Sequence, residues 1–90
     1  MNKIIVTVTG EDQVGIIGKV CTYLSDQNIN ILDISQSVTS GFFNMLVIAD
    51  MSGASLSFDD AQEGLKKLGE ELGFEIRTQR EEIFTAMHRI

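Results

Sequence analysis

The amino-acid sequence predicts an α+β domain in which four strands and two helices follow one another in the order βαββαβ. Three observations lead to this prediction. Runs rich in β-branched and aromatic residues recur along the chain, two stretches with apolar residues at helical spacing separate them, and glycine or asparagine stands at most boundaries. The 90 residues suffice for one domain with a small core.

The first predicted strand covers residues 3–9, reading KIIVTVT. Alternate positions put Ile4, Val6 and Val8 on one face and Ile5, Thr7 and Thr9 on the other. Because both faces carry apolar residues, the strand is expected to lie inside the sheet. Gly10 is expected to close the strand, and residues 10–14 to form a loop.

The first predicted helix covers residues 15–27, with apolar residues at positions 17, 20, 21 and 24 on one face. Cys21, the chain's one cysteine, falls in this stripe and cannot form an internal disulfide. It is therefore interpreted as a small buried hydrophobe rather than a reactive thiol. Asn28 is expected to end the helix in a left-handed conformation.

Two long strands are predicted next, over residues 29–40 and 42–51, with Ser40 and Gly41 as the turn between them. In the first, Ile31 has the opposite parity to Leu32 and Ile34, so either a bulge near Ile31 or burial of both faces is required. The second is apolar on both faces, which indicates a central strand or an outer face covered by a partner.

The second predicted helix follows a small polar loop, residues 52–57, and begins with Ser57 and Asp60 in a pattern similar to a capping box. Apolar residues then repeat at positions 58, 61, 65, 68 and 72, and Gly73 ends the helix. Gly64 and Gly69 each cost about 1 kcal/mol relative to alanine inside a helix. Close packing against the sheet or another helix would offset that cost.

Residues 74–80 alternate apolar and polar side chains, as an exposed or edge strand does. Right-handed crossovers then place both helices on one face of an antiparallel sheet in the ferredoxin-like order 4-1-3-2. Residues 81–90 are predicted to form a short terminal helix that packs on the same domain or on its dimer partner. Its apolar side is made of Ile83, Phe84, Met87 and Ile90.

The composition argues against several classes of partner. With 13 acidic and 7 basic side chains the net charge is −6, which repels nucleic acid and anionic membrane surfaces. The chain begins directly in a strand, without the pattern of a signal peptide, and its apolar runs are shorter than a membrane span. A cytoplasmic location is the expectation.

Catalytic and cofactor sites are not expected. The glycine spacing of residues 10–15 is similar to a phosphate loop, but Ile16 and Ile17 stand where lysine and Ser/Thr are required. The first loop lacks the arginine of acylphosphatase-type enzymes, and His88 has no second metal ligand at helical spacing. No Ser/His/Asp set emerges, so we expect neither an enzyme nor a bound cofactor or metal.

The first loop and the following helix end carry a family resemblance. The pattern G-x-D-x-x-G-I at residues 10–16, followed by N-x-N-I at residues 28–31, resembles the ACT domain, a small ligand-sensing module of amino-acid metabolism. The resemblance covers residues 1–80 and is closest to short proteins that consist of a single ACT domain. It implies the ferredoxin-like fold and an amino-acid ligand held where two modules meet.

The same resemblance assigns candidate ligand-binding residues. It implies that Asp12 and Asn30 hold the ligand, with Gly15 permitting close approach of the backbone. The neighbouring Gly10, Glu11 and Ile16 complete the candidate set, although relatives often carry a polar side chain near position 10. The purely local alternatives are that Asp12 caps the helix and Asn30 fixes a turn. A divalent cation at Glu11 and Asp12 would have an incomplete set of ligands.

The predicted function is a regulatory, non-catalytic module that binds a small molecule, with an amino acid suspected, and acts as a homodimer. An Asp12 carboxylate facing an ammonium group, with the helix N–H groups facing a carboxylate, would suit a zwitterion. The alternative is a dimerisation module that docks on a protein target without a small ligand. A metal-binding regulator is the third, less favoured, interpretation.

Overall fold

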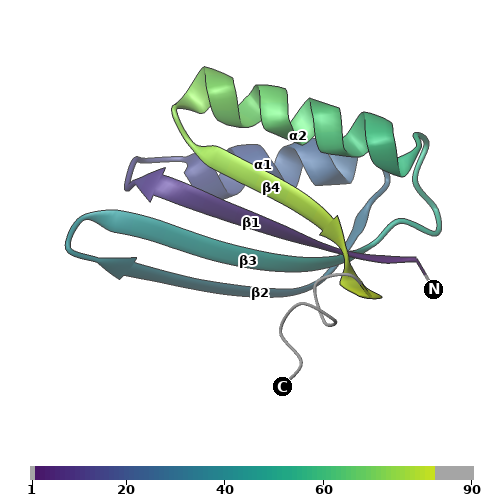
Figure 1. Ribbon diagram of the computed structural model, residues 1–90, viewed down its shortest axis with the longest axis horizontal. Helices are drawn as coiled ribbons and strands as arrows, with labels where there is room; N and C mark the ends of the chain where they lie inside the picture. Colours follow the sequence, from purple (N-terminus) through teal and green to yellow (C-terminus); the bar gives the residue numbers. More distant parts are fainter. Residues whose placement is uncertain (1, 83–90) are drawn as a thin grey trace.

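The computed structural model describes residues 2–82 and has the predicted ferredoxin-like βαββαβ order (Figure 1). Its elements are β1 (Lys3–Glu11), α1 (Ile16–Asp26), β2 (Asn30–Thr39), β3 (Phe42–Asp50), α2 (Phe58–Leu72) and β4 (Glu75–Arg80). The expected terminal helix covers residues 81–90, of which Glu81 and Glu82 are described and helical, and the rest lies outside the described part of the chain.

All strand pairs in the sheet are antiparallel, and the strand order is β2-β3-β1-β4. This is the predicted order 4-1-3-2 counted from the other edge. The two central strands are β1 and β3, as their apolar faces predicted, and β4 is an edge strand. Both helices cover the same face of the sheet (Figure 1), so the fold has two layers.

The core lies between this sheet face and the two helices. It contains the side chains of β1 that share one parity, the matching face of β3 and the inner faces of both helices. Its fully buried large side chains are Ile4, Val6, Val8, Val20, Leu24, Val47 and Leu65. Helix α2 buries Ala61 and Leu65 of its predicted stripe, whereas α1 buries Val20 and Leu24 of its stripe together with Ile16.

Helix boundaries follow the predicted capping residues. The Ser57 hydroxyl accepts a hydrogen bond of 3.2 Å from the backbone N–H of Asp60 and so caps α2. Gly73, with φ of 77°, ends α2 in the left-handed conformation, and Asn28, with φ of 58°, does the same beyond α1.

The two glycines inside α2 mark close contacts. A Cβ atom at Gly69 would lie 2.7 Å from the carbonyl oxygen of Phe74, so the end of α2 packs tightly on the segment that leads into β4. A Cβ atom at Gly64 would collide with the Tyr23 side chain of α1. These contacts, one with the sheet layer and one with the other helix, account for both helix-breaking residues.

A bulge resolves the parity conflict in β2. Ile31 pairs with Ala49, but the next pair along β3 is Asp33 with Ile48, so Leu32 is the extra residue. The structure therefore selects the bulge, the first of the two explanations that the sequence left open.

Two expectations for the first half of the chain are wrong. Gly10 does not end the first strand, because Gly10 pairs with Phe43 and Glu11 with Phe42, so β1 runs two residues further. Cys21 is half-buried rather than buried, because the core side of α1 is made of Ile16, Val20 and Leu24.

Candidate functional site

The loop between β1 and α1 is held at one end of the sheet by two hydrogen bonds. The backbone N–H of Asp12 donates to the Gly41 carbonyl at 3.0 Å, which ties the loop to the β2–β3 turn. The Gln13 side-chain Nε2 donates to the Leu72 carbonyl at 2.7 Å, which satisfies an orphan acceptor at the end of α2. The loop is therefore anchored on both layers of the fold.

The start of α1 is open. Its N-cap is Gly15, whose φ of 86° places it in the left-handed region that favours glycine. Within residues 2–82 no side chain caps this end, and the first turn contains no acidic residue. The backbone N–H groups of this turn, at the positive end of the helix dipole, are thus suited to an anionic group. The interpretation of Asp12 as the helix cap is wrong.

Gly10 is explained by packing. A Cβ atom at this position would lie 2.7 Å from the Phe74 ring. That ring makes an edge-to-face contact with Phe43, the β3 partner of Gly10, at a centroid distance of 6.1 Å. A larger side chain at position 10 would displace this aromatic pair, which is why this chain has no polar side chain there.

Glu11 and Ile16 flank the loop on opposite sides. Glu11 is the exposed last residue of β1. The side chain of Ile16 is only 3% exposed and belongs to the core, so its backbone N–H is the group it can present to a ligand.

Asn30 lies at the opposite end of the sheet. It pairs with Asp50, whereas Glu11 pairs with Phe42 at the other end of β3. Eight residues of strand separate these two rows, which is about 27 Å. Asn30 is an exposed strand residue, and the left-handed turn before it falls on Asn28. The structure thus brings Gly10, Glu11, Asp12, Gly15 and Ile16 together but leaves Asn30 apart within one chain.

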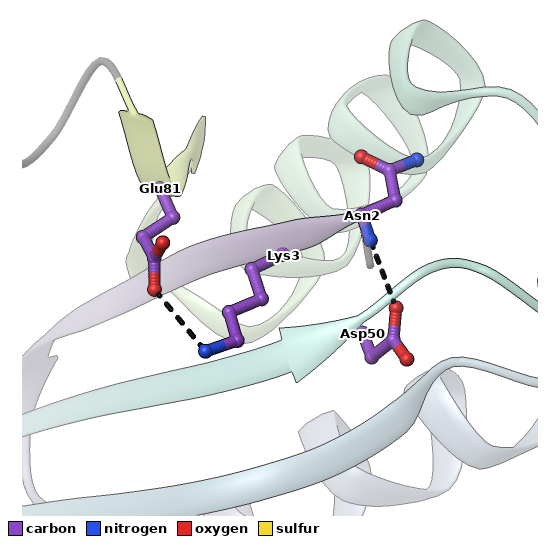
Figure 2. Close-up of polar contacts among 4 residues, drawn as sticks. All are labelled: Asn2, Lys3, Asp50 and Glu81. Carbon is purple, nitrogen blue, oxygen red and sulfur yellow. Dashed lines mark hydrogen bonds and ion pairs between the residues drawn. The ribbon is translucent and has the colours of Figure 1, made fainter.

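The carboxylate of Asp50, the β3 partner of Asn30, already accepts hydrogen bonds from other residues of the chain. Asp50 accepts hydrogen bonds from the Ser52 hydroxyl at 2.7 Å and the Ser52 N–H at 3.0 Å. It also accepts one from the Asn2 N–H at 3.2 Å (Figure 2). The hydrogen bonds from Ser52, and then that from Asn2, hold the pKa of Asp50 below its usual range. Asp50 therefore ties β3 to the chain start rather than presenting a free ligand group.

Two residues of the loop were not singled out from the sequence. Gln13 matters through its bond to α2, a contact over 59 positions that no local pattern reveals. Val14 is 99% exposed at the tip of the loop. An apolar residue in an otherwise polar loop is the sequence feature that could have singled out Val14.

A hollow on the surface lies elsewhere, between α2 and the edge strand β4, with a volume of about 700 Å³. Gln62 Nε2 donates to the Thr78 carbonyl at 2.8 Å across it. Within residues 2–82, no group of three or more His, Cys, Asp or Glu side chains is placed to hold a metal ion. Neither helix of this part of the chain is long and apolar enough to span a membrane.

The candidate site is thus a firmly held loop beside the open start of α1 in a two-layer βαββαβ domain. The family model described as the ACT domain matches residues 2–79. The chain belongs to the ACT domain family, whose members are regulatory modules that bind small molecules.

Individual relatives agree with this assignment. The chain is 56% identical over 90 residues to a UPF0237 protein of Bifidobacterium longum, and 41% identical over 90 residues to one of Methanocaldococcus jannaschii, with the whole of each chain covered. A solved ACT domain protein from Streptococcus pneumoniae superposes with a TM-score of 0.82 at 31% identity, covering 92% of this chain and 93% of that one. The likeness thus extends to short proteins of the same length.

Proposed function

We propose that this protein is a non-catalytic cytoplasmic regulator that binds a small zwitterion, an amino acid, at sites shared between the two chains of a homodimer. The observation that carries the proposal is the separation of Asp12 and Asn30. The family resemblance assigns both residues to one ligand, yet they lie at opposite ends of one sheet. Two chains related by a two-fold axis would bring Asp12 of one chain near Asn30 of the other.

Pairing of β2 with its own copy supplies the arrangement. β2 is an edge strand of ten residues, so one side of its backbone is available to another strand. Antiparallel pairing about a two-fold axis at its centre sets Asn30 beside Thr39 of the partner subunit. The partner's Asp12 is then about three strand spacings, or roughly 14 Å, from Asn30. Two side chains and an amino acid between them span that gap.

The side chains of β2 fit the same interface. Ile34 and Val38 lie on the helix side of the sheet, opposite Val47 and Phe43, yet they are 37% and 56% exposed. They are exposed because the helices leave this edge of the sheet uncovered (Figure 1). A second copy against β2 would bury both, adding apolar contact to the backbone hydrogen bonds.

The chemistry of the two ends is complementary to a zwitterion. The Asp12 carboxylate pairs with the ammonium group, and the open N–H groups at the start of α1 receive the carboxylate. The side-chain amide of the partner's Asn30 both donates and accepts hydrogen bonds, so it closes the site from the other chain.

A thermal-shift screen of the twenty amino acids tests ligand binding. A ligand at 100 times its dissociation constant adds about 2.7 kcal/mol to the free energy of unfolding, so binding gives a clear rise in Tm. Asp12→Ala and Asn30→Ala should each weaken binding of the identified ligand by about 1 to 3 kcal/mol.

A mixed dimer of the two variants tests the shared geometry. If each site takes Asp12 from one chain and Asn30 from the other, the mixed dimer has one site with both changes and one intact site. It should bind one ligand per dimer with the unmodified affinity, whereas each variant homodimer binds weakly throughout. A mixed dimer as weak as its parents would contradict the shared site.

A docking module without a small ligand is the second candidate function. Val14, at 99% exposure on a firmly held loop, favours it, because an apolar tip is suited to contact another protein. Absence of a thermal shift with every amino acid, together with loss of a co-purifying protein on Val14→Ser, would favour this function.

A further inference from the structure

The sheet face opposite the helices, here called the outer face, carries apolar side chains on its two central strands, and the edge strands carry polar side chains in the same rows. The exposed Phe42 lies on the same face at the β2–β3 turn, beyond a polar row. Cross-strand pairing sets Ile5 beside Ile48, and Thr7 beside Leu46, in successive rows. We call Ile5, Leu46 and Ile48 the outer patch. The next row toward the β2–β3 turn holds only polar side chains, namely Ser37, Asn44, Thr9 and Glu75.

The side chains of the outer patch are more buried than those of the polar row. Ile5 is 5% exposed, and Leu46 and Ile48 are half-buried, whereas Thr9, Asn44 and Ser37 are exposed. Both helices pack on the other face (Figure 1), so α1 and α2 take no part in covering the outer patch. The outer patch thus lies between the row of Lys3 and Asp50 and the row of Thr9 and Asn44. An apolar patch with polar rows on both sides has the pattern of a small docking surface.

The chain leaves the sheet beside the outer patch. Arg80, the last residue of β4, pairs with Ile4 at the start of β1. The following residue, Glu81, has its carboxylate 3.8 Å from the Lys3 ammonium group (Figure 2). Lys3 shares the outer-face parity of Ile5 and is its neighbour along that face. The Lys3–Glu81 pair therefore directs the chain toward the outer face, one row from the outer patch.

We propose that residues 83–90 of the same chain dock on the outer patch as a short amphipathic helix. Ile83, Phe84, Met87 and Ile90 share one side of such a helix. Eight helical residues extend about 12 Å, and rows on one sheet face are about 7 Å apart. The segment is thus long enough to cover the two rows that contain the outer patch, and it ends before the polar row.

Residues 83–90 of the same chain are a better occupant of the outer patch than a second copy of the protein. Two residues connect it to β4, so its local concentration near the patch is in the millimolar range or above. Three aliphatic side chains also offer much less than the roughly 800 Å² per partner of a standard protein interface. A second copy stacked on the outer face would have to bury the polar row as well.

Disulfide trapping in the full-length chain tests the proposal. In a Cys21→Ser background, Leu46→Cys combined with Met87→Cys should form an intramolecular disulfide under oxidised glutathione. The matched control, Thr9→Cys with Met87→Cys, places the first thiol in the polar row of the same face. We expect the Leu46 pair to form at least tenfold faster than the control, with the product at the mass of one chain. Equal rates, or a covalently linked dimer as the main product, would overturn the proposal.

Removal of the segment gives a second measurement. A chain ending at residue 82 should bind more of a hydrophobic dye and unfold at a lower temperature. Ile48→Ser should return dye binding of the shortened chain toward that of the full-length protein, because it removes the exposed apolar surface. A shortened chain with unchanged dye binding and Tm would contradict docking. Neither experiment involves an amino acid or the β2 edge, so the result is separate from the proposed function.

Discussion

The ring of Phe74 lies directly over Gly10, so close that a Cβ atom on Gly10 would come within 2.7 Å of a ring carbon. Gly10 is in a central strand, where glycine is usually unfavourable because it packs no side chain. The aromatic ring supplies the missing contact. This pair joins the start of β4 to the end of β1, next to the loop that carries Asp12.

Gly10→Ala should therefore destabilise the fold by about 1 to 3 kcal/mol, because the added methyl group overpacks the site. Urea unfolding at a fixed protein concentration measures the effect. In a Phe74→Leu background the same substitution should cost less, since the ring is absent. Equal costs in both backgrounds would show that the ring is not the source of the strain.

Two helical glycines should respond in opposite directions to alanine. Gly18 of α1 has open space where a Cβ atom would be, so Gly18→Ala should stabilise the protein by up to about 1 kcal/mol through helix propensity. Gly69→Ala would press a methyl group against the Phe74 carbonyl and should destabilise by about 1 to 3 kcal/mol. Thermal unfolding of both variants checks this, and a shift of the same sign at both positions would contradict it.

Tyr23 should make the fold sensitive to alkaline pH. Partial burial, and then the negative charge of Asp60, raise the pKa of Tyr23 above its ordinary value of 10.0. The folded protein therefore holds the phenol proton more tightly than the unfolded chain does. That contribution is complete below about pH 10 and is lost as the pH rises through the folded-state pKa. Urea midpoints between pH 9 and 11 should fall less steeply for Tyr23→Phe than for the unmodified protein.

Most of the fold followed from local patterns, because the features that define each element are close together in the chain. Ser57 with Asp60 predicted the start of α2, and Asn28 predicted the left-handed residue beyond α1. The parity conflict around Ile31 indicated either a bulge or burial of both faces, and the structure has the bulge. In each case a residue type has one strong local role, so the tertiary structure had little to override.

The candidate site was predictable only in part, because it depends on contacts between distant segments. Gln13 reaches Leu72, and Phe74 covers Gly10, over more than fifty positions. The local alternative for Asp12, a helix cap, is wrong, because the N-cap of α1 is Gly15 and the backbone N–H of Asp12 donates to the Gly41 carbonyl. Asp12 follows the end of β1 and Asn30 begins β2. Because both strands pair antiparallel with β3, β1 and β2 run in the same direction and the two residues lie at opposite ends of the sheet, as the predicted strand order implies.

Leu65 tests the core stripe of α2. It is fully buried, whereas Leu68 on the same helix is half-buried. Leu65→Ala should lower the free energy of unfolding by about 2 to 5 kcal/mol, a large share of the stability of a domain this small, while Leu68→Ala should cost clearly less. A change below about 0.5 kcal/mol for Leu65→Ala would contradict burial of the stripe.

The last prediction concerns assembly through β2. The chain mass is 9.9 kDa, so the proposed dimer should appear at about 20 kDa in sedimentation or light scattering at micromolar concentrations. Val38→Lys puts a charge into the apolar part of the β2 edge, where a partner would have to desolvate it, and should shift the protein to the monomer mass. Val14→Lys makes the same change at an exposed valine outside β2 and should leave the dimer intact. A species that stays near 9.9 kDa for the unmodified chain would exclude the dimer, and equal effects of both lysines would exclude β2 as its interface.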